Sequence, residues 1–140
     1  MNTKLMFSSK TDNWSTPQYF FDELNKEFKF TLDPCADHIN YKCNSYYTKE
    51  DDGLNKDWSG NIVFCNPPYG RELRQWVRKA YLESKKPNTT VVMLIPARTD
   101  TTYFHEYIYG KAEIRFIKGR LKFGCSNNSA PFPSMLVIFR

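Results

Sequence analysis

Four residues near the middle of the chain combine an amide, two prolines and an aromatic ring. The tetrapeptide Asn66-Pro67-Pro68-Tyr69 follows the apolar run 62–65. Adjacent prolines stiffen the backbone and donate no hydrogen bonds, so this loop is suited to holding groups in place. Asn66 offers a side-chain carbonyl, Pro67 offers a free backbone carbonyl, and we expect Tyr69 to expose a flat ring.

Two carbonyl acceptors beside an aromatic ring suit a planar group that carries an exocyclic amine. The amine of adenine or cytosine is a poor nucleophile because its lone pair is delocalised into the ring. Hydrogen bonds from the amine to two carbonyls return electron density to nitrogen and stabilise the positive charge that develops there. No strong base is then needed if the electrophile is as reactive as a sulfonium methyl donor. Stacking of the base on Tyr69 would contribute roughly 1–3 kcal/mol.

The loop depends on the elements that position it. Residues 62–65 read as a buried strand that ends at Asn66, and the short strand 30–32 ends at Asp33-Pro34. In open parallel sheets, ligands bind where strands end at their carboxyl edges. We therefore expect Asp33 and the tetrapeptide to lie at the same rim of a sheet.

The rest of the chain alternates between helical and strand patterns. Helical spacing predicts a helix through Phe28, with Thr16 as N-cap and Pro17 as its first residue, and a second helix over 71–86. The remaining elements we expect are a strand over 89–95, a short helix over 103–109, a hairpin of 114–117 with 120–123 about Lys118-Gly119, and a last strand over 135–139. This order predicts an α/β fold with a mainly parallel sheet, helices on both faces and a C-terminal antiparallel hairpin. We expect a polar tail over 1–13 and a single domain over 14–140.

Several motifs together resemble a known family. They are STPQYFFDEL, FTLDPCAD, the DGL and Trp of DDGLNKDW, VFCNPPYG and APFPSMLVIF. Their types and order are similar to those of the small phage-type, Dam-like DNA N6-adenine methyltransferases, and the resemblance covers about residues 14–139. It implies a compact Rossmann-like methyltransferase fold with S-adenosylmethionine as methyl donor.

The resemblance assigns roles to individual residues. It implies that Asn66, Pro67 and Tyr69 hold the target base while Pro68 fixes the loop. It also implies that Asp33 accepts a hydrogen bond from the methionine ammonium of the cofactor, a charge-assisted contact.

The same resemblance extends the cofactor site. Thr16 would approach the methionine carboxylate at a helix N-terminus, where anions are favoured. Pro34 and Cys35 would complete the corner after Asp33, in a segment that lacks the glycine-rich turn usual in such folds. The acids for the ribose and the adenine of the cofactor would come from Asp51, Asp52 or Asp57, which the sequence does not rank.

Charge is divided unevenly along the chain. Residues 1–70 carry 7 Lys and Arg against 10 Asp and Glu, whereas residues 71–140 carry 13 against 5. Such asymmetry indicates a polyanionic partner for the second half, and we expect DNA there. The substrate-binding candidates are Arg71, Arg74, Arg78, Arg120 and Phe132, the last as the far wall of the base pocket.

Composition limits the other functional classes. Cys35, Cys43, Cys65 and Cys125 lack a C-x-x-C spacing, so we expect free thiols and no metal site. No apolar run approaches a membrane span, and residues 1–15 lack a signal-peptide core, so we expect a cytoplasmic protein. A homodimer that grips DNA is one arrangement that the sequence leaves open.

Three functions compete on these observations. Methylation of adenine N6 in DNA is the favoured prediction. Methylation of cytosine N4 is an alternative because the same tetrapeptide serves both amines. A DNA- or protein-binding module derived from a methyltransferase is another, since the segment between Asp33 and Asn66 is compressed.

Overall fold

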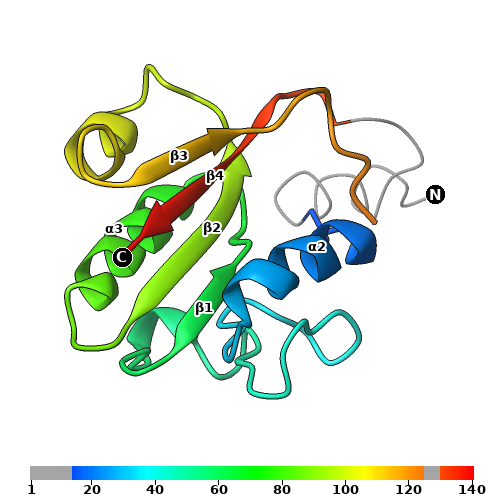
Figure 1. Cartoon of the computed structure of the whole chain (residues 1–140), viewed down its shortest axis with the longest axis vertical. Helices are drawn as coiled ribbons and strands as arrows, with labels where there is room; N and C mark the ends of the chain where they lie inside the picture. Colours follow the sequence, from blue (N-terminus) through cyan, green and yellow to red (C-terminus); the bar gives the residue numbers. More distant parts are fainter. Residues whose placement is uncertain (1–13, 125–129) are drawn as a thin grey trace.

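An open sheet of four strands forms the centre of the computed structural model, which describes residues 14–124 and 130–140 (Figure 1). The strands are β1 (Ile62–Cys65), β2 (Thr90–Pro96), β3 (Glu113–Phe116) and β4 (Ser134–Phe139), in the spatial order β1-β2-β4-β3. β1 pairs in parallel with β2, while β2 with β4 and β3 with β4 are antiparallel. The predicted α/β class is confirmed. The predicted mainly parallel sheet is not confirmed, because two of the three strand pairings are antiparallel.

The predicted hairpin about Lys118-Gly119 is wrong. β3 pairs with the last strand, in a register that sets Ile114 opposite Val137 and Phe116 opposite Met135. Every residue of β4 is buried, so both edges of this strand need a hydrogen-bonding partner. β3 supplies one partner and β2 the other, and the segment after Gly119 leaves the sheet.

A short segment extends the sheet beyond β1. The amide of Thr31 donates to the carbonyl of Ile62 (2.8 Å), and the amide of Phe64 donates to the carbonyl of Leu32 (3.0 Å). Leu32 and Val63 form an isolated parallel bridge, so the predicted strand 30–32 is shorter than a regular strand. Because this segment runs parallel to β1, Asp33 leaves the sheet at the same rim as Asn66.

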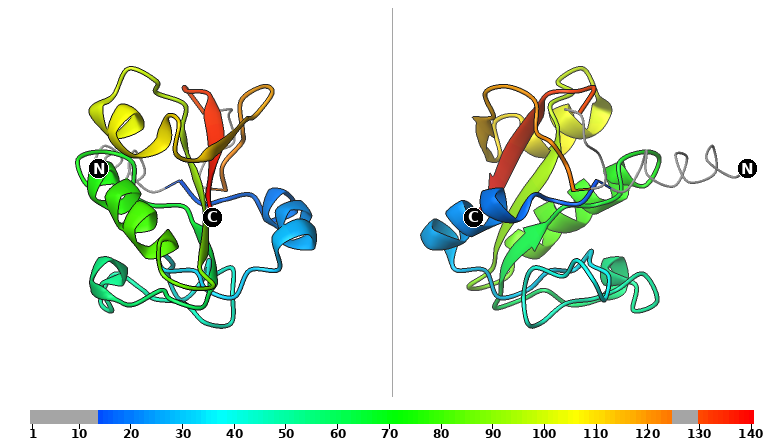
Figure 2. Two further views of the ribbon diagram at one scale, coloured as in Figure 1. Left: turned by 60° about the vertical axis from the view of Figure 1, so that its left-hand side comes forward. Right: turned by 90° about the vertical axis from the view of Figure 1, so that its right-hand side faces the viewer.

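Helices lie on both faces of the sheet (Figure 2). The elements are α2 (Gln18–Phe28) on one face, and α3 (Leu73–Ser84) with the π-helical turn η2 (Phe104–Ile108) on the other. α2 buries Phe21, Leu24 and Phe28, which recur at helical spacing. α3 buries a stripe of Leu73, Trp76, Val77 and Ala80, as its spacing predicted, together with Glu83.

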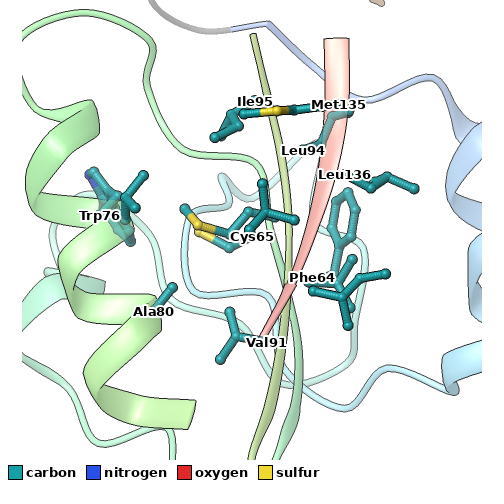
Figure 3. Packing of buried hydrophobic residues seen from close by; sticks show 14 of the residues in the cluster. Phe64, Cys65, Trp76, Ala80, Val91, Leu94, Ile95, Met135 and Leu136 are labelled. Carbon is teal, nitrogen blue, oxygen red and sulfur yellow. The ribbon is translucent and has the colours of Figure 1, made fainter. Parts of the chain in front are cut away.

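Alternate residues of the strands fill the two sides of the core (Figure 3). Phe64 and Leu136 point toward the face that α2 covers, whereas Cys65 and Val91 point toward Trp76 and Ala80 of α3. The apolar run predicted to be covered on both sides is β2, in which all six residues after Thr90 are buried.

Little regular structure lies between Asp33 and β1. The short 3₁₀ turn η1 (Gly53–Asn55) packs directly against the Asp33-Pro34 corner. A Cβ added at Gly53 would lie 2.1 Å from the carbonyl oxygen of Pro34, so only glycine permits this approach. In the described parts of the chain, no helix has the length and apolarity needed to cross a membrane.

Candidate active site

The amide of Asn66 is held in one orientation at the end of β1. Its Nδ2 donates to the backbone carbonyl of Trp14 and to the hydroxyl of Thr16, at 2.9 Å from the latter. Its Oδ1 is buried and has no hydrogen-bond partner among the described residues. A buried carbonyl oxygen without a donor is costly, so a hydrogen-bond donor placed beside this atom would be favoured.

Thr16 reaches Asn66 because it does not cap the helix. α2 begins at Gln18 with Pro17 in the capping position and no side-chain cap. The carbonyl of Pro17 instead accepts from the amides of Phe20 and Phe21, at 3.1 and 3.2 Å. The prediction of Thr16 as N-cap is therefore wrong by one residue. Thr16 is buried and joins the N-terminal segment to the loop after β1.

Asp33 is the buried acid of the site, with 3% of its surface exposed. Its Oδ1 accepts from the amide of Cys35 (3.3 Å), and its Oδ2 accepts from the amide of Lys42 (3.0 Å). Burial raises the pKa of Asp33 to about 6, and these two backbone hydrogen bonds oppose the shift. The carboxylate is thus poorly solvated, and a bound cation would stabilise it.

A cleft of about 460 Å³ joins this acid to the loop after β1. Its lining includes the predicted residues Thr16, Asp33, Pro34, Cys35, Asp52, Asn66 and Pro68. A volume of this size is typical of sites for small organic ligands. The two strand ends predicted to meet at one rim therefore do so around a single cleft.

The acids of the middle segment can now be distinguished. Asp52 lines the cleft, with a left-handed backbone (φ 61°) and a hydrogen bond accepted from the side chain of Asn55. Asp51 does not line it, and its Oδ2 accepts from the amide and hydroxyl of Thr48 at 2.9 and 3.1 Å. Asp57 is bound to Ser59 and Lys86. Asp51 and Asp57 therefore stabilise turns.

Sequence reasoning missed several polar residues of the cleft. The further charged lining residues are Asp37, Lys42, Lys49 and Glu72. Asp37 stood within the motif FTLDPCAD, and Glu72 lies two residues beyond the loop that ends at Gly70. Proximity to the two strand ends was the available signal for both.

Tyr69 is buried, so the prediction of an exposed ring is wrong. Only 5% of its surface is accessible, and its hydroxyl donates to the carbonyl of Leu94 at 2.9 Å. β1 ends opposite Met93, one residue before Leu94, and the tyrosine hydroxyl satisfies a carbonyl beyond that pairing. Burial raises the pKa of Tyr69 well above its ordinary value, so the hydroxyl stays protonated.

Two more rings, Phe123 and Phe132, pack against Tyr69, and Trp14 packs against both of them. The edge-to-face pairs include Phe132 against Tyr69 and against Trp14, with ring centroids 5.6 and 5.3 Å apart, and Phe123 against Tyr69 at 6.3 Å. Phe132 therefore lies beside the loop after β1 and is buried at 7% exposure. It does not line the main cleft, and its predicted role as the far wall of the base pocket stays a prediction. Pro67 is buried as well.

A second hollow of about 440 Å³ lies beside the loop, lined by Pro68, Tyr69, Gly70, Arg71 and Glu72. Pro68 and Glu72 also line the main cleft, so the two cavities adjoin there.

The predicted basic residues differ in their surroundings. Arg71 and Arg78 are exposed, and Arg71 borders the second hollow; their contact with DNA stays a prediction. Arg74 pairs with Glu106 at 3.0 Å. Arg120 donates to the carbonyl of Ala130 at 3.5 Å.

The three described cysteines, Cys35, Cys43 and Cys65, are free thiols. Burial raises the pKa of Cys43 to about 12 and raises those of Cys35 and Cys65 as well, so all three are protonated at neutral pH. Cys125 lies outside the described residues, as does the predicted tail 1–13. Over residues 14–124 and 130–140, no cluster of His, Cys, Asp or Glu is arranged to bind a metal ion.

Comparison with known proteins identifies the family. The model of the Dam family, described as DNA N-6-adenine-methyltransferase, matches residues 3–140. A protein of Haemophilus phage HP1 (strain HP1c1) is named DNA N-6-adenine-methyltransferase and is 35% identical to this chain over an alignment of 146 residues, gaps included. The alignment covers 99% of this chain and 82% of that protein. A protein of Escherichia phage T1 with the same name is 36% identical over 112 residues, covering 79% of this chain and 46% of its own length. The chain thus belongs to the Dam family of DNA N-6-adenine-methyltransferases.

Proposed function

We propose that this protein transfers a methyl group from S-adenosylmethionine to the N6 amine of adenine in DNA. The observation that carries the proposal is the unpartnered Oδ1 of Asn66, at the end of β1 beside the cleft that contains Asp33. The names of the Dam family model and of the two phage relatives support the same reaction.

The residues of the cleft suit S-adenosylmethionine. The buried carboxylate of Asp33 would accept a hydrogen bond from the methionine ammonium and regain the stabilisation that it loses by burial. The hydroxyl of Thr16 accepts from Asn66 and donates to no described residue, so its proton is available to the methionine carboxylate. Asp52 is the acid that we assign to the ribose hydroxyls. When bound, the cofactor supplies a methyl group activated by its sulfonium.

The loop after β1 would act on the substrate amine. Asn66 Oδ1 accepts one N–H, and the carbonyl of Pro67 accepts the other, since no described backbone amide donates to it. Both carbonyl dipoles then point at the nitrogen on which positive charge develops, and no side chain has to remove a proton first. The proton leaves for water after transfer.

The base needs a place beside this loop. A base in a duplex cannot reach the loop while stacked, so it must be flipped out or come from a single strand. We assign it to the second hollow, which adjoins the cleft at Pro68 and Glu72 and is bordered by Tyr69. Stacking on Tyr69 requires the ring to leave its contacts with Leu94 and Phe132, so we propose that base binding moves this tyrosine.

We also infer that the sheet is a compact Rossmann-like sheet. Segment 31–33, β1 and β2 run in one direction. β3 shares this direction, because both β2 and β3 are antiparallel to β4, and only β4 is reversed. The site lies where the first strands end, which is the usual ligand edge of such sheets.

The test is incubation of mixed-sequence DNA with labelled S-adenosylmethionine, followed by nucleoside analysis. We expect N6-methyladenine from the unsubstituted protein and none from Asn66→Ala, which should still bind the cofactor. N4-methylcytosine would support the alternative substrate. The absence of any modified base, together with DNA binding, would support the non-catalytic module; neither alternative is favoured by the family and its relatives.

A further inference from the structure

The orientation of the Asn66 amide is fixed by chemistry as well as by position. A backbone carbonyl can only accept hydrogen bonds, so the group that faces the Trp14 carbonyl must be the NH₂ of Asn66. The second hydrogen of the NH₂ is directed at the hydroxyl of Thr16, 2.9 Å away. Both donors of the amide are therefore used within the protein, and only Oδ1 remains.

This orientation decides whether the loop can bind an amine. An exocyclic amine donates two N–H groups, so it needs acceptors, and a flipped amide would present its own NH₂ to the substrate. Two donors facing each other leave both unsatisfied, which costs the full desolvation of each buried group. The acceptor geometry at the amine therefore depends on what lies behind Asn66.

We propose that Thr16 is a positioning residue for methyl transfer: its hydroxyl, with the carbonyl of Trp14, locks the Asn66 amide so that Oδ1 faces the substrate amine. The inference rests on the proposed function and goes beyond it, since it assigns to Thr16 a task apart from cofactor binding. Thr16 lines the cofactor cleft while its hydroxyl bonds Asn66, so one side chain links the two halves of the site.

The first experiment compares Thr16→Val with Thr16→Ser in steady-state kinetics. Valine removes the hydroxyl at nearly constant shape, so we expect kcat to fall at least 10-fold, whereas serine restores it to within 3-fold of the unsubstituted protein. A role in cofactor binding alone would raise KM for S-adenosylmethionine and leave kcat unchanged. A kcat of Thr16→Val within 2-fold of the unsubstituted value overturns the proposal.

Thr89→Val is the matched control. Thr89 is buried to the same degree as Thr16, at 6% against 5% exposure. Its hydroxyl accepts from the amide of Gly60 and donates to the carbonyl of Pro87, away from the cleft, so the substitution removes at least as many described hydrogen bonds as Thr16→Val. We expect this variant to lower Tm and to leave kcat unchanged. A fall in kcat equal to that of Thr16→Val would assign both effects to lost stability and overturn the proposal.

The second experiment needs neither cofactor nor DNA. Thermal unfolding is measured for Thr16→Val, Asn66→Ala and the double variant, because residues that share a hydrogen bond give non-additive effects. We expect the double variant to lose clearly less Tm than the two single losses combined. If the Tm losses of the two single variants simply add in the double variant, Thr16 and Asn66 are not energetically coupled, and the proposal is overturned whatever the methylation activity. Absence of methyl transfer by the unsubstituted protein, with coupled Tm losses, overturns the proposed function and with it the positioning role.

Discussion

At position 33, a buried carboxyl group lines the cleft in which we place the methionine ammonium of the cofactor. The folded-state pKa of Asp33, about 6, lies above the ordinary value of 3.8, since burial disfavours the charged form. Ionisation of Asp33 therefore costs folding stability. That cost is absent below pH 4 and grows as the pH rises to about 6. A bound ammonium would reverse the balance, because it favours the carboxylate.

The first prediction follows from this linkage. Cofactor affinity should fall as the pH drops through 6, approaching 10-fold per pH unit, because binding then expels a proton from Asp33. Isothermal titration calorimetry between pH 5 and 8 measures the effect. Asp33→Asn is the control and should bind weakly with little pH dependence. A constant affinity in the unsubstituted protein over this range would show that Asp33 does not face the cofactor charge.

Tyr69 carries the second prediction. Tyr69→Phe leaves the buried carbonyl of Leu94 without its donor, so the free energy of unfolding should fall by about 1–3 kcal/mol. Methyl transfer should persist, because phenylalanine keeps the flat face on which a base stacks. Urea unfolding and the methylation assay measure the two effects. Loss of transfer at unchanged stability would instead assign a chemical role to the hydroxyl.

At the scale of elements, local patterns predicted the helices and the buried strands well. The apolar stripe of α3 and the run of β2 follow directly from residue spacing, and the bounds differ by a few residues. The meeting of Asp33 and Asn66 was also predictable, because each follows a strand of the same direction. Strand pairing was not predictable in this way. Lys118-Gly119 is a valid turn signal, but β3 pairs with the later strand β4 and not with the segment 120–123 that follows the turn.

The burial of Tyr69 could not be predicted from the sequence for a similar reason. A tyrosine that follows two prolines can be exposed or buried, and its own neighbours do not decide between these states. Its hydroxyl is needed inside because β1 stops opposite Met93, which leaves the Leu94 carbonyl to be satisfied. That need arises from sheet register, which sequence spacing does not contain.

The contact between η1 and the Asp33-Pro34 corner gives the third prediction. Gly53→Ala would place a Cβ 2.1 Å from the Pro34 carbonyl oxygen and 3.3 Å from the ring of Trp76, so one wall of the cleft must move. We expect a loss of about 1–3 kcal/mol in the free energy of unfolding and weaker cofactor binding. Chemical denaturation and calorimetry measure both effects.

Gly124→Ala is the matched control for this substitution. Among the residues that the structure describes, a Cβ at Gly124 would meet only Ser15, at 3.5 Å or more, which is ordinary contact. We expect it to change the free energy of unfolding by much less than Gly53→Ala. Equal losses in the two variants would mean that the close approach at Pro34 is not what requires glycine.

At the scale of the whole molecule, the two halves of the chain differ in net charge, and we assign cofactor binding mainly to the first half and DNA binding to the second. The acid-rich first half supplies Asp33, Asp37 and Asp52 to the cleft that would hold a cationic cofactor. The second half, with 13 Lys and Arg against 5 Asp and Glu, begins directly after the loop at β1. A polyanion approaching this half would therefore meet the site where we place the base.

Salt dependence gives the last prediction and separates two arginines of α3. Arg78 is exposed, while the charge of Arg74 is already paired with Glu106 at 3.0 Å. Each phosphate contact adds roughly one unit to the slope of log affinity against log salt. If Arg78 contacts phosphate, Arg78→Ala should reduce the slope by about one unit, and Arg74→Ala should reduce it less, because DNA must first displace Glu106.

The control for this measurement is Lys26→Ala, on α2 across the sheet from α3, where Lys26 pairs with Glu23 at 2.9 Å. Its slope should equal that of the unsubstituted protein in a fluorescence anisotropy titration. Equal slopes for Arg78→Ala and Lys26→Ala would remove this face of α3 from the DNA interface. A reduction in Arg74→Ala as large as in Arg78→Ala would instead mean that DNA opens the Arg74–Glu106 pair. Replacing Glu106 by Gln should then strengthen binding, because Arg74 would be free before DNA arrives.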